Sequence, residues 1–321
     1  MRIGILGYGY MGTIRHRVLR ERADCEVVRI FHTEEAPAPR AARWQDVVDD
    51  PAIDAVFVCL PSDLTGAASC RALAAGKHVF AEKPPGTSVA EARRMQDAER
   101  ASGRTLQFGF NHREHPAFRA LRAQCASRAL GELLWMRGVY GKPMATDFDT
   151  SWRADPARAG GGILLDQGVH LLDLMLVLAG GFDRVHAVAR TRPGARVEDD
   201  VMAVLCAPSG AIGSLHSSHA QSPPRFSLEL GFSRGAARLE GLLTRTGRYG
   251  PERVAWGPAS APDEHEERFS EDDSWAREID AFLRAARTGI PPENGSSAQA
   301  VALMTLVERI YDAAGLAHGA R

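Results

Sequence analysis

Residues 2–12 read Arg-Ile-Gly-Ile-Leu-Gly-Tyr-Gly-Tyr-Met-Gly, and this stretch decides the fold of the first part of the chain. Residues 2–6 have the apolar composition of a buried strand, and the segment after the glycines repeats apolar residues on one helical face. A glycine motif between a strand and a helix is the context in which it binds a dinucleotide. Gly7 permits the tight turn, Gly9 lets the backbone approach a pyrophosphate, and Gly12 lets helix and strand pack closely. A chance glycine triplet is the alternative interpretation.

The residues predicted to contact the cofactor lie in this loop and after the following strands. They are Gly7, Tyr8, Gly9, Tyr10, Met11, Gly12, His32, Thr33, Glu34, Leu60, Pro61, Glu82 and Lys83. An NAD-binding unit usually carries an acid roughly 20 residues past the glycines to hold the ribose. Glu34 stands slightly late but within reach, whereas Arg40 and Arg43 could meet the 2′-phosphate of NADP. The pair Glu34-Glu35 would repel that phosphate and favours NAD; NADP stays open.

Strands and helices alternate through residue 110. The sequence predicts further strands at 27–31, 53–60, 77–81 and 105–110, and helices at 64–75 and 88–102. This alternation predicts a doubly wound parallel sheet with right-handed crossovers. Ligands of such sheets bind outside the carboxyl ends of the strands. Residues 61–63, 82–84 and 111–113 fall there.

Residues 160–170 read Gly-Gly-Gly-Ile-Leu-Leu-Asp-Gln-Gly-Val-His and suggest chemistry. The three glycines predict a flexible entry to a buried helix that starts at Ile163. Asp166 and His170 stand four residues apart, so both side chains project from one helical face. A carboxylate beside an imidazole on an apolar helix is costly to bury without purpose and well suited to moving a proton. A helix N-terminal acid with a satisfied core histidine is the structural alternative.

Lys83 is the second chemical signal, because it follows a buried strand and precedes Pro84. A lysine held at this place can stabilise an alkoxide on a substrate or lower the pKa of a hydroxyl. An ordinary surface lysine in a loop is the alternative.

Together these residues resemble the glucose–fructose oxidoreductase/inositol dehydrogenase (Gfo/Idh/MocA) family. The matching segments are GYGYMG at 7–12, AEKP at 81–84, GFNHR at 109–113, GGGILLDQGVHLLDL at 160–174 and the ending from 290 to Tyr311. Two features depart from the family pattern: the displaced ribose acid, and LPSDLTG at 60–66, which lacks a histidine near position 65. The displaced acid bears on the choice between NAD and NADP, whereas the missing histidine bears only on local contacts.

The resemblance implies an α/β protein of two domains: a Rossmann domain at 1–117, and a substrate-binding and oligomerisation domain at 118–321 whose C-terminal helix is able to pack back on the first. The second domain would carry a large open, mostly antiparallel sheet. Its expected strands are 132–141, 184–191, 200–207, 211–219, 226–232 and 235–240. The family also implies a cis Lys83–Pro84 peptide and a homodimer or homotetramer formed through this sheet, whose uncovered face would call for a partner.

The implied reaction is hydride transfer between a nicotinamide and a secondary alcohol or ketone carbon of a sugar, nucleotide sugar or cyclitol. Lys83, Asp166 and His170 match the family's catalytic set, with His170 as acid/base because its ordinary pKa is about 6.5. We expect Asn111, His112, Arg113, Trp152 and Arg153 to contact substrate, and Arg113, Arg137 and Arg153 could meet a diphosphate. A cofactor-retaining enzyme of net non-redox chemistry, such as glycoside cleavage, and a non-catalytic cofactor sensor are the rival interpretations.

Other segments carry weaker signals. Asp147 and Asp149 are minor pocket candidates, His115 is expected to open a helix, and His216 and His219 are expected to decorate a sheet face. The acidic stretch 257–273 reads as a solvated loop before a helix that begins near Trp275.

The bulk composition excludes several classes of protein. The 321 residues are 45% hydrophobic and 25% charged with a net charge of −1, so no basic field would gather nucleic acid or anionic lipid. The five scattered cysteines, without a CxxC pair, argue against a disulfide framework or structural zinc and suit a reducing compartment. No signal region, no apolar run approaching ~18 residues and no metal requirement are expected. The sequence thus predicts a cytoplasmic enzyme with a small-molecule substrate.

Overall fold

The structure is a computed structural model that describes residues 1–34, 36, 37, 39–245 and 248–316. Glu35, one of the two glutamates considered for the ribose, lies outside these residues. The described chain divides into two compact units. The first unit comprises Met1–Phe110 and Trp275–Met304, and the second comprises Asn111–Ser274 and the residues from Thr305 onward. The expected division at residue 117 is therefore drawn at Phe110, and a late segment returns to the first unit.

Within the described residues, the first unit contains a six-stranded parallel sheet of order β3-β2-β1-β4-β5-β6. Its strands are β1 (Arg2–Leu6), β2 (Glu26–Phe31), β3 (Arg40–Ala41), β4 (Ala55–Val58), β5 (His78–Glu82) and β6 (Leu106–Gly109). The register Leu6↔Phe31 and Leu6↔Val58 aligns the carboxyl ends of β1, β2 and β4. This arrangement confirms the predicted doubly wound sheet, with the reversal of strand order at β1.

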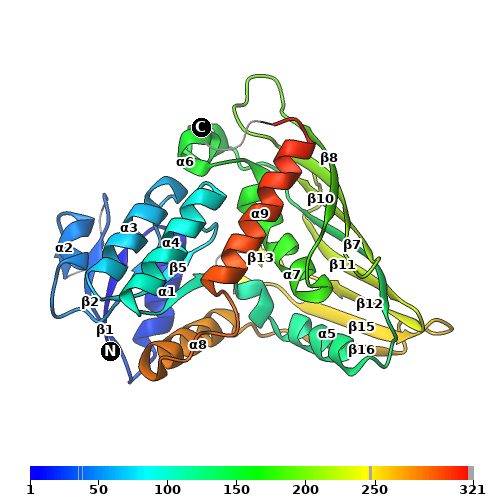
Figure 1. Cartoon of the computed structure of the whole chain (residues 1–321), viewed down its shortest axis with the longest axis horizontal. Helices are drawn as coiled ribbons and strands as arrows, with labels where there is room; N and C mark the ends of the chain where they lie inside the picture. The colour runs from blue at the N-terminus through cyan, green and yellow to red at the C-terminus, as the bar shows by residue number, and fades with distance from the viewer. Residues whose placement is uncertain (35, 38, 246–247, 317–321) are drawn as a thin grey trace. The chain divides into compact units, whose positions relative to one another are not determined.

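Helices cover both faces of this sheet. They are α1 (Tyr10–Arg20), α2 (Trp44–Val48), α3 (Ser62–Ala74), α4 (Val89–Ser102), α8 (Ser274–Thr288) and the start of α9 (Ser297–Ala313). Helices α3 and α4 lie side by side (Figure 1). On the other face, Ile279 and Phe282 of α8 pack with Ile3, Ile5 and Leu19 in one buried cluster. Burial on both faces explains why the central strands read as continuous apolar runs.

A buried arginine ties three elements of the first unit together. Arg15 on α1 is fully buried, and its Nε lies 2.7 Å from Glu82 Oε1 at the end of β5. Its Nη2 lies 2.8 Å from Glu278 Oε2 on α8, and its guanidinium stacks 4.6 Å from the centre of the Phe80 ring. Two carboxylates against one cation leave no buried charge of either sign without a partner. This cluster fixes α1, the helix that starts in the glycine loop.

The second unit is built on an eight-stranded sheet of order β16-β15-β12-β11-β7-β10-β9-β8 within the described residues. The strands are β7 (Leu133–Gly141), β8 (Arg184–Arg190), β9 (Asp200–Cys206), β10 (Ile212–Ser218), β11 (Arg225–Phe232), β12 (Gly235–Glu240), β15 (Glu252–Pro258) and β16 (His265–Phe269). The β10–β7 pair is parallel and the other pairs are antiparallel, which confirms the expected sheet. A two-stranded ribbon, β13 (Thr244–Arg245) and β14 (Arg248–Tyr249), lies outside it.

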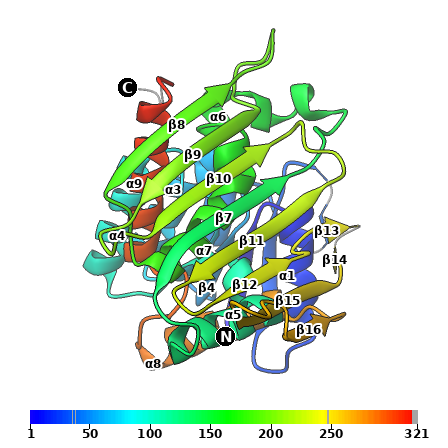
Figure 2. The ribbon, with the colours of Figure 1, turned by 90° about the vertical axis from the view of Figure 1, so that its right-hand side faces the viewer.

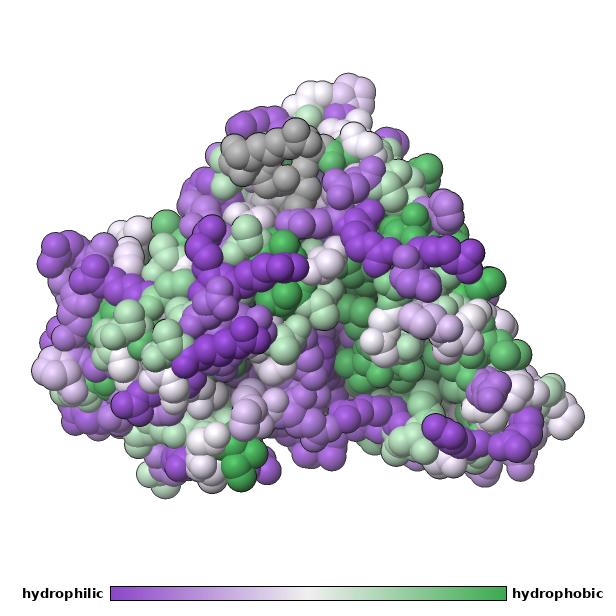
Figure 3. Space-filling model, viewed as in Figure 1, coloured by the Kyte–Doolittle hydropathy of each residue, from purple (hydrophilic) through white to green (hydrophobic). Residues whose placement is uncertain are grey.

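The sheet of the second unit has one covered and one open face. Helix α7 (Val169–Ala179) lies behind the sheet in Figure 2, where Leu171 fills the space left by Gly138 on β7. The unit's other helical segments are η1 (Asn111–Glu114), α5 (Pro116–Ser127), η2 (Phe148–Thr150), η3 (Trp152–Ala154), α6 (Pro156–Ala159), η4 (Leu164–Gly168) and the end of α9. Hydrophobic side chains reach the surface along the right-hand rim of Figure 3, over the strands of this sheet.

Two expectations about these segments were wrong. Residues 257–273 do not form only a loop, because β16 pairs with β15 from Trp256↔His265 to Glu252↔Phe269. An edge strand has a single partner and exposed side chains, so His-Glu-Glu-Arg-Phe carries the charge of a loop. The segment Pro156–Ala179 is long and apolar enough to cross a membrane by composition, which was not expected. Its most apolar window is 72% buried, as in a core helix.

Replacing Arg15 by Met should destabilise the first unit by about 3–5 kcal/mol, because Glu82 and Glu278 would be left buried without a cation. Urea unfolding followed by circular dichroism measures the loss. Arg17→Met, an exposed position on the same helix, is the control and should cost little. Equal losses for both variants would contradict the structural role of the cluster.

Candidate active site

The glycine loop of the first unit is shaped by close backbone contacts. Gly7 adopts a positive φ of 87°, and a Cβ there would lie 2.3 Å from the carbonyl oxygen of Cys59. A Cβ at Gly12 would lie 2.0 Å from the carbonyl oxygen of Gly7. Among the described residues, by contrast, no atom lies within 4 Å of the Cβ position at Gly9. Gly9 therefore leaves open space at the N-terminus of α1, where unpaired N–H groups bind phosphate.

The residues after β2 lie against this loop. The Tyr8 N–H donates to His32 Nδ1 at 3.2 Å, so the His32 ring supports the loop itself. Glu34 is exposed, while Arg43 is paired with Asp46 at 2.8 Å at the start of α2. Arg40 reaches the His32 carbonyl oxygen at 3.5 Å. One of the two arginines considered for the 2′-phosphate of NADP, Arg43, is therefore already paired with a carboxylate.

The carboxyl ends of β4 and β5 present the other predicted cofactor residues of this unit. Pro61 is the N-cap of α3, and both Leu60 and Pro61 are half-buried. The Lys83–Pro84 peptide is cis, as the family resemblance implied, and Lys83 is half-buried. The Glu82 carboxylate is committed to Arg15, so it holds α1 in place; its direct contact with a cofactor stays a prediction.

The glycine run of the second unit is closely packed, so the prediction of a flexible entry was wrong. A Cβ at Gly161 would lie 2.2 Å from Tyr311 Oη, and one at Gly162 would lie 1.9 Å from the Glu198 carbonyl oxygen. Gly160 ends α6 with a φ of 82°. Each glycine is therefore required by a neighbour or by its backbone conformation.

Glu198 is the residue on which this packing converges. Its carboxylate accepts the N–H of Gly162 at 2.7 Å, the N–H of Leu164 at 3.1 Å and the hydroxyl of Tyr311 at 2.8 Å. Burial raises the pKa of Glu198, while these hydrogen bonds lower it. An acceptor at the first turn satisfies N–H groups that a helix leaves unpaired. The sequence carries no local signal for this role, because Glu198 and Tyr311 are distant from the glycines.

Asp166 and His170 come directly after this clamp, by which we mean the contacts of Glu198 and Tyr311 with the glycine run. Leu164–Gly168 form a π-helical turn that continues into α7 at Val169. Four residues make roughly one turn in both helix types, so the two side chains stay on one side. Asp166 is half-buried and His170 is buried. The ring of His170 stacks on that of His112 with centroids 4.1 Å apart and an interplanar angle of 20°.

Two further groups of the second unit lie close to Asp166. Arg153 Nε is 3.6 Å from Asp166 Oδ1, and the Arg153 guanidinium stacks 4.6 Å from the centre of the Trp152 ring. The structure thus brings Arg153 next to Asp166, with Trp152 stacked on its guanidinium. His219 is buried, with its ring edge-on to Phe148 at 5.0 Å. Burial lowers the pKa of His219, and the nearby Asp166 carboxylate raises it.

The segment 111–113 is buried among protein partners. Arg113 Nε and Nη2 contact the two carboxylate oxygens of Asp173 at 2.6 and 2.5 Å. Burial raises the pKa of Asp173, and Arg113 opposes this effect. Asn111 and His112 are also buried and contact Tyr249. Their direct contact with substrate, and that of Arg113, stays a prediction, since the described contacts of all three are with other residues of the protein.

His115 lies in a buried cluster with Glu252 and Asp272, residue types that also bind metals, within 4.8 Å of one another. His115 Nδ1 is 2.5 Å from Glu252 Oε1 and 3.5 Å from Asp272 Oδ1. Two ligands of one tetrahedral ion, each about 2.1 Å from it, would lie more than 3 Å apart. The His115–Glu252 contact is therefore a direct hydrogen bond. His115 is also the N-cap of α5, as predicted.

Several other polar positions considered from the sequence have partners or surroundings of their own. Arg137 pairs with Glu229 on the open face of the sheet, opposite α7, and Arg113 is paired with Asp173. The idea that Arg113, Arg137 and Arg153 meet one diphosphate is therefore wrong. His216 pairs with Asp200 at 2.8 Å on the open face, as expected. Asp149 pairs with Arg192. Asp147 lies in a turn before η2.

Two family models match consecutive parts of the chain. Residues 1–110 match the oxidoreductase family with an NAD-binding Rossmann fold, and residues 118–238 match the GFO/IDH/MocA C-terminal domain. A trans-1,2-dihydrobenzene-1,2-diol dehydrogenase from Sus scrofa is 31% identical over 232 residues, which cover 68% of either protein. The chain belongs to the Gfo/Idh/MocA family of oxidoreductases. It is an enzyme of the NAD-dependent dehydrogenase type.

Other relatives of this oxidoreductase agree in sequence and fold. A levoglucosan dehydrogenase from Pseudarthrobacter phenanthrenivorans is 29% identical over 262 residues, covering 68% of this chain and 67% of the relative. A solved structure of a levoglucosan dehydrogenase in complex with NADH superimposes with a TM-score of 0.84 at 22% identity, covering 98% of this chain and 97% of the other. This structural likeness extends over both units of the chain.

Replacing Gly162 by Ala should lower the free energy of unfolding by about 1–3 kcal/mol, because the methyl group meets the Glu198 carbonyl oxygen. We also expect turnover to fall in the fraction of the protein that stays folded, because the turn that carries Asp166 begins at this clamp. Urea unfolding and turnover measure the two effects. Gly250→Ala is the stability control, because the Cβ position at Gly250 lies 3.9 Å from the Leu243 carbonyl oxygen, an ordinary contact distance. A Gly162→Ala protein with normal stability would contradict the clamp.

Proposed function

We propose that this enzyme transfers a hydride between NAD and a secondary alcohol or ketone carbon of a sugar, nucleotide sugar or cyclitol. The observation that carries the proposal is the Asp166–His170 pair, with Asp166 on the π-helical turn, His170 on the first turn of α7, and Arg153 beside Asp166. π-Turns of this kind occur often at functional sites. The names of relatives, levoglucosan dehydrogenase and 1,5-anhydro-D-fructose reductase, support a sugar-type substrate.

The first unit would hold the dinucleotide. The open space at Gly9 fits a pyrophosphate at the N-terminus of α1, and Glu34 and His32 lie after β2, where the ribose is held in this fold. When bound, NAD supplies the hydride acceptor of the reaction. The chain's own residues then bind, orient and manage the proton.

His170 is proposed to take the proton of the substrate hydroxyl during oxidation and to return it during reduction. Histidine is suited to both steps because the pKa of an unperturbed imidazole, about 6.5, is close to physiological pH. Asp166 would orient the substrate or the ring of His170. Arg153 would stabilise the Asp166 carboxylate with its positive charge. Lys83 would stabilise the developing alkoxide with its positive charge.

The test is an absorbance assay at about 340 nm with NAD or NADP and a panel of sugars, anhydrosugars, cyclitols and nucleotide sugars. His170→Ala should lower kcat by about 10²–10⁴-fold, because general acid–base catalysis is lost. NAD binding, followed by calorimetry, should be unchanged.

His265→Ala is the matched control, since His265 is exposed on the edge strand β16. Normal turnover by His170→Ala would refute the proton-transfer role. Consumption of a glycoside without net change of absorbance, by a protein that retains its nicotinamide, would support the non-redox alternative. Cofactor binding with no turnover of any compound would support a sensor.

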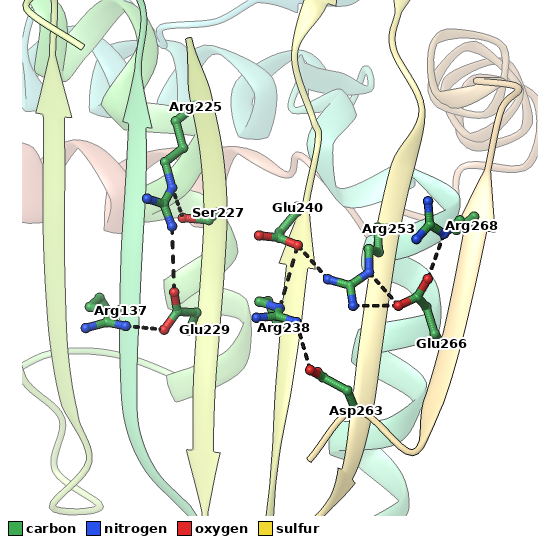
Figure 4. Close-up of polar contacts among 10 residues, drawn as sticks. All are labelled: Arg137, Arg225, Ser227, Glu229, Arg238, Glu240, Arg253, Asp263, Glu266 and Arg268. Carbon is green, nitrogen blue, oxygen red and sulfur yellow. Dashed lines mark hydrogen bonds and ion pairs between the residues drawn. The ribbon is translucent and has the colours of Figure 1, made fainter. Parts of the chain in front are cut away.

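We also propose that a second copy of the chain covers the open face of the eight-stranded sheet. The exposed apolar residues of this face gather on β7 to β10: Trp135, Val188, Met202, Val204 and Ile212. The remaining strands carry alternating arginines and carboxylates that pair across the face, such as Arg253 with Glu240 and Glu266 (Figure 4). A face with an apolar half and balanced charges suits a two-fold partner with the same surface.

Replacing both Met202 and Val204 by Glu should yield a monomer in light scattering after size exclusion, because unpaired charges would be buried at the interface. Ile290→Glu, an exposed apolar residue outside this sheet, should leave the assembly unchanged. A wild-type monomer would refute the proposal.

We further propose a cytoplasmic enzyme, since all five cysteines are free thiols.

A further inference from the structure

The imidazole of His112 is packed flat against that of the proposed acid/base. The two ring centroids lie 4.1 Å apart at an interplanar angle of 20°, and both residues are buried. Phe226 and Tyr249 meet His112 edge-on at 5.4 and 5.7 Å, so the ring has aromatic neighbours on its edges as well as His170 on its face. Such a ring has little freedom to rotate.

A hydrogen-bonded chain fixes His112 from behind. The Asn111 side-chain amide donates to Tyr249 Oη at 3.0 Å. Because that oxygen accepts from Asn111, the Tyr249 hydroxyl proton is available for His112 Nε2, 3.1 Å away. In this arrangement the Tyr249 hydroxyl holds the Nε2 edge of the His112 ring.

The chain ends on a buried carboxylate. Asn111 Nδ2 lies 3.3 Å from His115 Nε2, and His115 Nδ1 lies 2.5 Å from Glu252 Oε1. The second oxygen of Glu252 accepts the Ala117 N–H at 3.1 Å, at the first turn of α5. Polar groups from η1, α5, β14 and β15 therefore form one continuous network. Buried networks of this kind are rigid when their members are satisfied.

We infer that His112 is a positioning residue for His170, held in place by Tyr249, Asn111 and the His115–Glu252 pair. The inference rests on the proposed function and assigns His112 a role different from the substrate contact expected from sequence. The stacked ring restricts the orientation of the His170 imidazole.

Three variants test the role by kinetics. His112→Leu removes the aromatic stack and should lower kcat by about 10–100-fold with KM and NAD binding within about twofold, because a misplaced catalytic group slows the chemical step. His112→Phe keeps a stacked ring and should recover most of the loss. Tyr249→Phe removes one hydroxyl and should fall between wild type and His112→Leu. His265→Leu, on the exposed edge strand, is the control.

A second measurement does not require activity. In protein labelled with 13C-histidine, the His170 Cε1–H signal is identified by its loss in His170→Ala. It should shift in His112→Leu, because the ring current of the stacked partner is removed, and keep a ring-current displacement in His112→Phe. Thermal unfolding of each variant accounts for any loss of folded protein.

The outcomes separate the two levels of the argument. A raised KM with unchanged kcat in His112→Leu would make His112 a substrate contact and overturn the inference. Unchanged kcat together with an unmoved His170 signal would overturn it as well. If the wild-type enzyme oxidises no alcohol, the proposed function fails, while the NMR comparison still decides whether His112 holds the His170 ring.

Discussion

The buried carboxylate of Glu198 is the constraint on which the turn carrying Asp166 and the start of α7 depend. It binds the Gly162 and Leu164 N–H groups at the start of the π-turn and the Tyr311 hydroxyl from α9. Burying a carboxylate is costly, and three donors compensate for the water that it loses. Because the turn that carries Asp166 begins at these bonds, the position of Asp166 depends on a residue 36 positions away from Gly162 in the sequence.

Glycines serve opposite purposes in the two units. In the cofactor loop, Gly7 and Gly12 are required because backbone carbonyls stand where a side chain would begin, whereas Gly9 leaves space unfilled. In the second unit, Tyr311 packs against Gly161 and Glu198 packs against Gly162, so that no space remains for a side chain at either glycine. The first arrangement keeps room for a ligand, and the second removes room for motion. The same residue type therefore indicates binding in one place and rigidity in the other.

Buried charges in this enzyme are compensated in small closed groups. Arg15 lies between two carboxylates, and Arg113 faces Asp173 with two hydrogen bonds. Arg113–Asp173 anchors α7 one turn beyond His170, and the His112 network meets the same histidine through its ring face. The His170 imidazole, the proposed acid/base, is thus supported from its own helix and from a neighbouring segment. Such support is what proton transfer at a fixed position requires.

The sequence by itself determined the features that local spacing encodes. The glycine motif between strand and helix, the alternation through residue 110 and the four-residue spacing of Asp166 and His170 depend on neighbours within one or two turns, and the strand compositions up to 240 follow a period of two. Only the tertiary structure decided which distant groups meet. Glu198 lies 36 residues from Gly162, and Asp173 lies 60 from Arg113. A charged edge strand such as β16 has the composition of a loop until its partner is known. Local periodicity says which face of an element is apolar, but the partner of a buried polar group is fixed by the three-dimensional packing of the whole unit.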